Sequence, residues 1–147
     1  MAARSEWGSL VSDFKKEIHE LVATERDKLA VIALTAVVEE SPVDQGTFVL
    51  NNIVSIGSPD FTSDETRKSS LGSLFTDDYD AHAEVAKGEA LSQGKRKISK
   101  RKRIFTEIYI QNNVSYVDEV EETGWYYKDA YETYKKAADY LERHIDN

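Results

Sequence analysis

The chain has no cysteine among its 147 residues, and this absence excludes disulfide bonds, thiolate metal ligands and cysteine nucleophiles. Apolar residues never run together for the roughly 20 positions that a membrane-spanning helix needs. The first residues also lack the apolar segment of a signal peptide. We therefore expect a protein that suits a reducing cytoplasm, is not embedded in a membrane and is not exported through a signal peptide.

Residues that build a core are plentiful. Hydrophobic residues make up 40% of the chain and aromatic residues 10%, which is too many for a disordered protein. A length of 147 residues is typical of one domain, and neither a repeat nor a low-complexity linker divides the chain. We expect a single folded domain over residues 1–147.

The net charge of −8 is unevenly distributed. Seven basic residues and no acidic one lie between positions 95 and 103, which leaves 12 basic against 27 acidic residues elsewhere, a balance of −15. The seven are Lys95, Arg96, Lys97, Lys100, Arg101, Lys102 and Arg103. A block of like charge this dense stays solvated unless an anionic partner neutralises it. The sequence thus predicts an acidic body with one basic arm.

Apolar residues recur at three- and four-residue steps from about Ser9 to Glu39, which predicts one long helix or two abutting helices. They are Leu10, Phe14, Ile18, Leu21, Val22, Leu29, Ile32, Ala33 and Ala36. Such a helix would reach roughly 46 Å, longer than a domain of this size needs. We expect part of it to contact another subunit, and its polar face to be solvated.

A turn follows this helix over Ser41-Pro42-Val43-Asp44-Gln45-Gly46. Pro42 has no backbone N–H and pushes Ser41 out of the helical region, so the helix must end there. Asp44 is expected to accept a backbone N–H near Thr47, and Gly46 is free to adopt a positive φ. We predict that Ser41, Pro42, Asp44 and Gly46 form a structural turn.

Two segments have the pattern of strands, Thr47 to Ile56 and about Ile104 to Ile110. We expect them to pair antiparallel in one small sheet, with the long helix covering its apolar face. A stretch of about 45 residues, 57–102, separates them and is longer than an ordinary connection. It should contain a loop over residues 61–75, a short helix over 80–91 that ends at Gly94, and the basic arm as a projecting loop.

After the second strand we expect a turn, about one helical turn over Val114 to Glu122, and an end at Gly124. A helical stripe with an aromatic face then runs from Trp125 to the C-terminus. The predicted architecture is α+β: a long N-terminal helix packed on a small antiparallel sheet, a long loop and helix insertion, and a C-terminal helix.

Motifs that carry chemistry are missing from the sequence. The three histidines, His19, His82 and His144, lie on different predicted helices without cysteine or regularly spaced carboxylates beside them. No phosphate-binding glycine loop, nucleophile elbow or calcium loop is present. We therefore expect no catalytic residue, no metal site and no cofactor.

The basic arm over residues 95–103 leaves three interpretations open. It could bind nucleic-acid backbone, because seven cations would release counterions from phosphates and give steep salt dependence. It could dock on an acidic protein surface, including that of a neighbouring copy. It could also be a solvated loop. No aromatic residue interleaves the charges, so reading of a base sequence is not expected.

Two motifs in order resemble those of a known family. The first is the Ser41 to Gly46 turn. The second is Ile108-Tyr109-Ile110-Gln111-Asn112-Asn113, followed by Tyr116, Glu121-Glu122 and Gly124. Together they resemble the tail-completion and neck proteins of long-tailed bacteriophages, in which Ser-Pro-Val-Asp-Thr-Gly precedes a strand and Asn-Asn, Tyr and Glu-x-Gly follow a later strand. The resemblance spans roughly residues 39–125, with Gln45 in the place of the usual threonine.

The resemblance implies a virion protein without catalytic residues that forms a homo-oligomeric ring at the head–tail junction. It implies a head-closure or adaptor protein on one side and a tail terminator or tail tube protein on the other, with the DNA channel between them. The basic arm would contact a neighbouring ring, which we favour, or the DNA in the channel. Alternative interpretations are a tail terminator ring capping the tail tube and a nucleic-acid-binding accessory protein.

Overall fold

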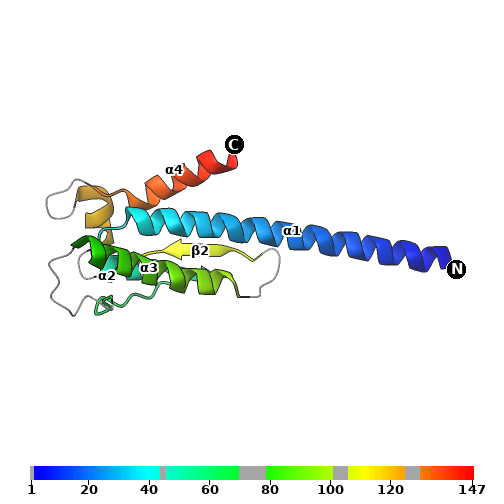
Figure 1. Cartoon of the computed structure of the whole chain (residues 1–147), viewed down its shortest axis with the longest axis horizontal. Helices are drawn as coiled ribbons and strands as arrows, with labels where there is room; N and C mark the ends of the chain where they lie inside the picture. The colour runs from blue at the N-terminus through cyan, green and yellow to red at the C-terminus, as the bar shows by residue number, and fades with distance from the viewer. Residues whose placement is uncertain (1, 44–45, 70–78, 101–105, 125–129) are drawn as a thin grey trace.

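The computed structural model describes residues 2–43, 46–69, 79–100, 106–124 and 130–147 (Figure 1). The elements, in chain order, are α1 (Ala2–Glu40), α2 (Thr47–Leu50), β1 (Ile53–Ile56), α3 (Tyr79–Ile98), β2 (Ile108–Gln111), the π-helix η1 (Glu119–Thr123) and α4 (Thr133–Ile145). Long helices and a two-stranded antiparallel sheet confirm the predicted α+β class.

Helix α1 is one continuous helix of 39 residues, which corresponds to roughly 58 Å. The other elements gather around its C-terminal half, and its N-terminal half extends beyond them (Figure 1). The predicted stop is confirmed, because α1 ends at Glu40, two residues before Pro42. Ser41 is buried there, and its hydroxyl donates a 2.7 Å hydrogen bond to the Val37 carbonyl.

The prediction of a strand from Thr47 to Ile56 is wrong for its first half. Thr47–Leu50 is a helical turn, and only Ile53–Ile56 is a strand. The side chains of Phe48, Val49 and Leu50 are all buried, Val49 and Leu50 in the main core and Phe48 in a second cluster with Val114 and Val120. Asn51 closes the turn, since its side-chain amide donates to the Thr47 carbonyl at 2.7 Å. Gly46 starts the turn at the expected positive φ, 91°.

Strands β1 and β2 pair antiparallel, as predicted, with Val54 opposite Ile110 and Ser55 opposite Tyr109. The second strand is shorter than the predicted 104–110 stretch: Thr106 and Glu107 precede it without strand geometry, and residues 104 and 105 lie outside the described residues. The Glu107 carbonyl still accepts a 2.8 Å hydrogen bond from Gly57 N, which closes the pair at that end.

The core lies between α1, α3 and the sheet, and includes Leu34, Val38, Val54, Ala90 and Ile98. Leu34 and Val38 do not belong to the apolar stripe that predicted the helix. The C-terminal half of α1 is apolar on two sides: Ala30 and Val31 join Leu34 and Val38 in this core, while Ile32 and Ala36 lie roughly opposite them. The sheet is therefore covered by a different face of α1 from the one the spacing indicated.

Helix α3 corrects the prediction for the connecting segment. It runs from Tyr79 to Ile98 rather than from 80 to 91, and Gly94 lies inside it instead of ending it. Gly94 is where α3 approaches α1 and β1 most closely: a Cβ there would overlap Leu34 Cδ2 and lie 3.1 Å from Val54 Cγ2. Gly94 therefore permits close packing, while residues 61–69 form the expected loop.

The two glycines of α3 should respond oppositely to replacement by alanine. A Cβ at Gly88 would meet no atom within 4 Å, so Gly88→Ala should raise the free energy of unfolding by roughly 1 kcal/mol through helix propensity alone. Gly94→Ala should lower it by about 1–3 kcal/mol, since the buried Leu34 must move. Urea unfolding followed by circular dichroism measures both, and two stabilising substitutions would contradict this packing.

The C-terminal part agrees with the prediction in order but not in bounds. The short helical element ends at Gly124, which has a φ of 111°. Residues 125–129 lie outside the described residues, and the last helix begins only at Thr133, after Glu132 in a left-handed conformation. Helix α4 then packs along α1, with Ala137 buried and Lys136 Nζ 3.4 Å from Glu40 Oε2.

Candidate assembly surface

Large apolar side chains are exposed on the projecting half of α1. Among the residues that the structure describes, ten large hydrophobic side chains are exposed, and seven of them lie between positions 7 and 22. The seven are Trp7, Leu10, Val11, Phe14, Ile18, Leu21 and Val22. Trp7 is 68% exposed, Phe14 62% and Leu21 63%. Burying a side chain of this size is worth about 1.5–3 kcal/mol, so leaving seven in water is a large cost for an isolated chain.

The seven residues form a single surface, which we call the α1 stripe. Their three- and four-residue steps place them on one side of the helix, within an arc of about 120°. Leu34 and Val38, which pack on the sheet, lie roughly on the opposite side. The exposed area is on the order of 700 Å², above the 300–600 Å² of the largest patch on a typical monomer. Contiguous apolar patches of this size mark interaction surfaces.

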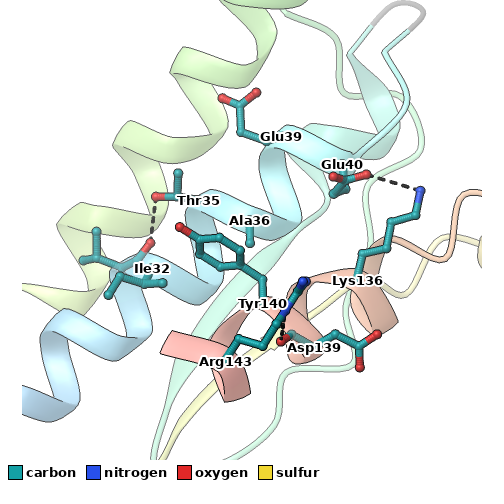
Figure 2. A pocket seen from close by; sticks show the side chains of 10 residues that line it. Ile32, Thr35, Ala36, Glu39, Glu40, Lys136, Asp139, Tyr140 and Arg143 are labelled. Atoms are coloured by element: carbon teal, nitrogen blue, oxygen red, sulfur yellow. Dashed lines mark hydrogen bonds and ion pairs between the residues drawn. The ribbon is translucent and has the colours of Figure 1, made fainter. Parts of the chain in front are cut away.

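A groove continues the α1 stripe toward the C-terminal end of the helix. It encloses about 550 Å³ between α1 and α4. Ile32 and Ala36 of α1 line it, and the Tyr140 ring of α4 points toward them (Figure 2). Charged groups border it: Lys136 pairs with Glu40, and Arg143 Nε donates to the Asp139 carbonyl at 3.1 Å (Figure 2). Tyr140 is itself 51% exposed, so the apolar surface extends onto α4.

The basic arm is only partly a loop. Lys95, Arg96 and Lys97 lie in the last turn of α3, so the prediction of a projecting loop is wrong for these three, while Lys100 lies in a bend after the helix. Arg101, Lys102 and Arg103 lie outside the described residues. The physical reason is helix propensity: lysine and arginine are good helix formers, and cations are favourable at a helix C-terminus.

The basic end of α3 lines a hollow of about 320 Å³ together with the half-buried Arg67. Arg67 is held in place there, because Nη1 donates to the Leu50 carbonyl at 2.8 Å and Nη2 contacts Gln93 Oε1. The exposed Glu119 and Glu122 of η1, with Asp118 just before it, lie at the opposite end of the body (Figure 1). Charge of opposite sign is therefore separated along the molecule.

The two sequence motifs meet in a buried hydrogen-bond network around Asn52. Its amide nitrogen donates to Ser41 Oγ at 2.8 Å, and its amide oxygen accepts from Asn112 Nδ2 at 3.1 Å. The same oxygen accepts a 2.8 Å hydrogen bond from the Tyr134 hydroxyl of α4. Asn112 Nδ2 also donates to the Phe48 carbonyl at 2.9 Å. The network joins α1, α2, the end of β2 and α4.

The environment of Tyr134 keeps its hydroxyl protonated. Burial raises the pKa of Tyr134 far above its usual value, and the nearby Glu121 carboxylate raises it further. Sequence reasoning missed Asn52 and Tyr134. A signal was present, since asparagine is disfavoured in strands and two adjacent ones, Asn51 and Asn52, stood within a predicted strand.

Neighbouring polar residues attach the loop over residues 57–69 to the body. Asn113 Nδ2 donates to the Asp60 carbonyl at 2.7 Å, and the Ser115 N–H donates to Glu65 Oε1 at 2.6 Å. This hydrogen bond holds the pKa of the Glu65 carboxyl below its ordinary value. In the predicted structural turn, Pro42 is half-buried and Gly46 is buried, while Asp44 and its expected contact lie outside the described residues.

Among the described residues, no group of three histidine, aspartate or glutamate side chains is placed to hold a metal ion. His82 contacts Ser69 Oγ at 2.8 Å. None of the helices in the described ranges combines the length and the apolar character that crossing a membrane requires. Comparisons with protein-family models, curated proteins and solved structures find no match for this chain.

Proposed function

We propose that this protein is a structural subunit of the virion of a long-tailed bacteriophage, one that forms a homo-oligomeric ring at the head–tail junction. The observation that carries the proposal is the α1 stripe, an apolar surface on a helix that projects beyond its own domain. A subunit whose function is assembly must present such a surface, because apolar burial drives most protein association. No catalytic role enters this proposal.

The resemblance of the two sequence motifs to neck and tail-completion proteins supports the same proposal. Their residues have a structural role here, since Ser41 and Asn112 join different elements through Asn52. The acidic body also suits a channel that DNA must leave, because a negative surface does not retain phosphates. The neighbours in the proposal are a head-closure or adaptor protein and a tail terminator or tail tube protein.

Deletion of the gene from the phage that encodes this chain tests the function. The proposal predicts that infected cells accumulate DNA-filled heads and separate tails, which electron microscopy of lysates distinguishes. Expression of the wild-type chain from a plasmid should restore joined particles and serves as the control. Joined, infectious particles without the chain would refute the proposal, and tails of uncontrolled length would favour a tail terminator instead.

The basic end of α3 favours one alternative, a nucleic-acid-binding accessory protein. Four described cations, Lys95, Arg96, Lys97 and Lys100, lie together there. The neck proposal predicts no saturable binding of duplex DNA by the isolated chain at about 150 mM salt. Fluorescence anisotropy over a salt series measures this. Tight binding that weakens steeply with salt, and is lost in the K95Q/K97Q/K100Q variant, would favour the accessory protein.

A further inference from the structure

The α1 stripe and the α1–α4 groove lie on the same face of one straight helix. Phe14, at the centre of the stripe, and Ile32, in the groove, are 18 residues apart, which is about five full helical turns and roughly 27 Å. Both side chains therefore point in nearly the same direction. Within the described part of the chain nothing covers the stripe, and Ile32 and Ala36 in the lining of the groove continue its face.

Two copies of such a helix can cover each other's exposed apolar face. If two α1 helices run antiparallel about a two-fold axis near Ala23, Phe14 of each copy falls opposite Ile32 of the other. The projecting half of each helix then lies over the body of its partner. Helix α3 and the sheet pack on the opposite side of α1, where Leu34 and Val38 lie, while α4 borders this face and leaves the groove beside it. Because the contact has two-fold symmetry, it buries the stripe and the groove of both copies.

We propose that the free protein is an antiparallel two-fold dimer in which the α1 stripe of each copy occupies the α1–α4 groove of the other. This proposal goes beyond the assembly function and does not depend on it. The stripe alone supplies on the order of 700 Å² per copy, close to the 800 Å² per partner of a standard stable interface. Tyr140 and Ile145 of α4, both more than half exposed, add to the same surface.

Symmetry gives this dimer a consequence for ring formation. In a closed ring of three or more copies, neighbouring subunits are related by a rotation smaller than a half-turn, so an antiparallel two-fold contact cannot recur around the ring. The stripe must therefore make a different contact in a ring. The dimer would cover the stripe in solution and open only when a ring contact competes for it.

Sedimentation velocity over a concentration series of the full chain tests the dimer. The wild type should sediment as a dimer at micromolar concentration. Phe14→Glu in the stripe and Tyr140→Glu in the groove should each raise the dimer dissociation constant at least about thirtyfold. Phe61→Glu is the matched control, because Phe61 is 78% exposed but belongs to neither site, and it should leave the constant unchanged. Circular dichroism establishes that each variant is folded.

Single cysteines test the orientation, since the chain has none of its own. A mixture of the F14C and I32C chains should form a disulfide-linked heterodimer on mild oxidation, while F14C alone should not, because the Cα atoms must approach within about 7 Å. Crosslinking of F14C with itself would indicate parallel helices and overturn the proposal. A wild type that sediments as a monomer would also overturn it without bearing on the neck function. A wild type that sediments as a larger ring would overturn the dimer while favouring the proposed ring.

Discussion

Asn52→Ala should lower the free energy of unfolding by about 3–5 kcal/mol, which is among the largest effects of any single substitution in the described residues. The change removes the acceptor of the Tyr134 hydroxyl and of Asn112 Nδ2, and the donor to Ser41 Oγ. Ser41, Asn112 and the Tyr134 hydroxyl lie at buried sites that water does not easily reach. The Tyr134 hydroxyl loses its acceptor, whereas Ser41 and Asn112 each lose one hydrogen bond and keep another, to the Val37 and Phe48 carbonyls. A lost hydrogen bond costs about 1 kcal/mol, and a buried polar group left without a partner costs about 1–3 kcal/mol.

Urea unfolding followed by circular dichroism measures this loss. Tyr134→Phe is the matched control, because it removes one hydroxyl and one hydrogen bond and should cost only about 1 kcal/mol. The double variant should lose less than the sum of the two, since Asn52 and Tyr134 share a hydrogen bond. A loss below about 1 kcal/mol for Asn52→Ala would show that the network does not hold the elements together.

Two glutamates in the α1 stripe, Phe14→Glu and Leu21→Glu together, should abolish assembly while leaving the domain folded. Both side chains are more than 60% exposed and lie on the half of α1 that projects from the body, so the substitution removes no core contact. Charge at the centre of an apolar interface should weaken association at least about a hundredfold. The helical circular dichroism signal should stay close to that of the wild type, and the melting temperature should fall only by the amount that dimer formation contributes.

Complementation of the deleted phage measures the effect of this double substitution on assembly. We expect unjoined heads and tails and a correspondingly low yield of infectious particles. The Phe61→Glu variant, which places a charge at an equally exposed aromatic residue away from the stripe, should complement normally. Normal yield from the double variant would mean that the stripe has no role in assembly.

Local signals in the sequence predicted much of this fold. Pro42 ends α1 where expected because its ring acts on its immediate neighbours, whatever the tertiary structure. The antiparallel pairing of β1 and β2 followed from two short apolar segments that needed one core. The helical turn Thr47–Leu50 was not predictable from propensity, because its valine and phenylalanine favour strands and tertiary burial overrides that preference.

The orientation of α1 was also beyond local signals. Its second half carries apolar residues on opposite sides, with Leu34 facing the sheet and Ile32 facing the groove. Periodicity reveals a stripe but not what covers it. The expectation that part of α1 contacts another subunit stays a prediction, now attached to named residues. Gly94 was likewise mistaken for a helix end. The reason for a glycine there is its close contact with Leu34, which lies 60 residues earlier in the chain and gives no local signal.

The most direct test of the proposed assembly function is a cryo-electron microscopy reconstruction of the head–tail junction of the phage in which we propose that this chain acts. The proposal predicts a ring of this protein there, with Phe14 and Leu21 buried against a neighbouring subunit or an adjoining ring protein. A junction that lacks the chain, or one in which the α1 stripe faces solvent all round the ring, would contradict it.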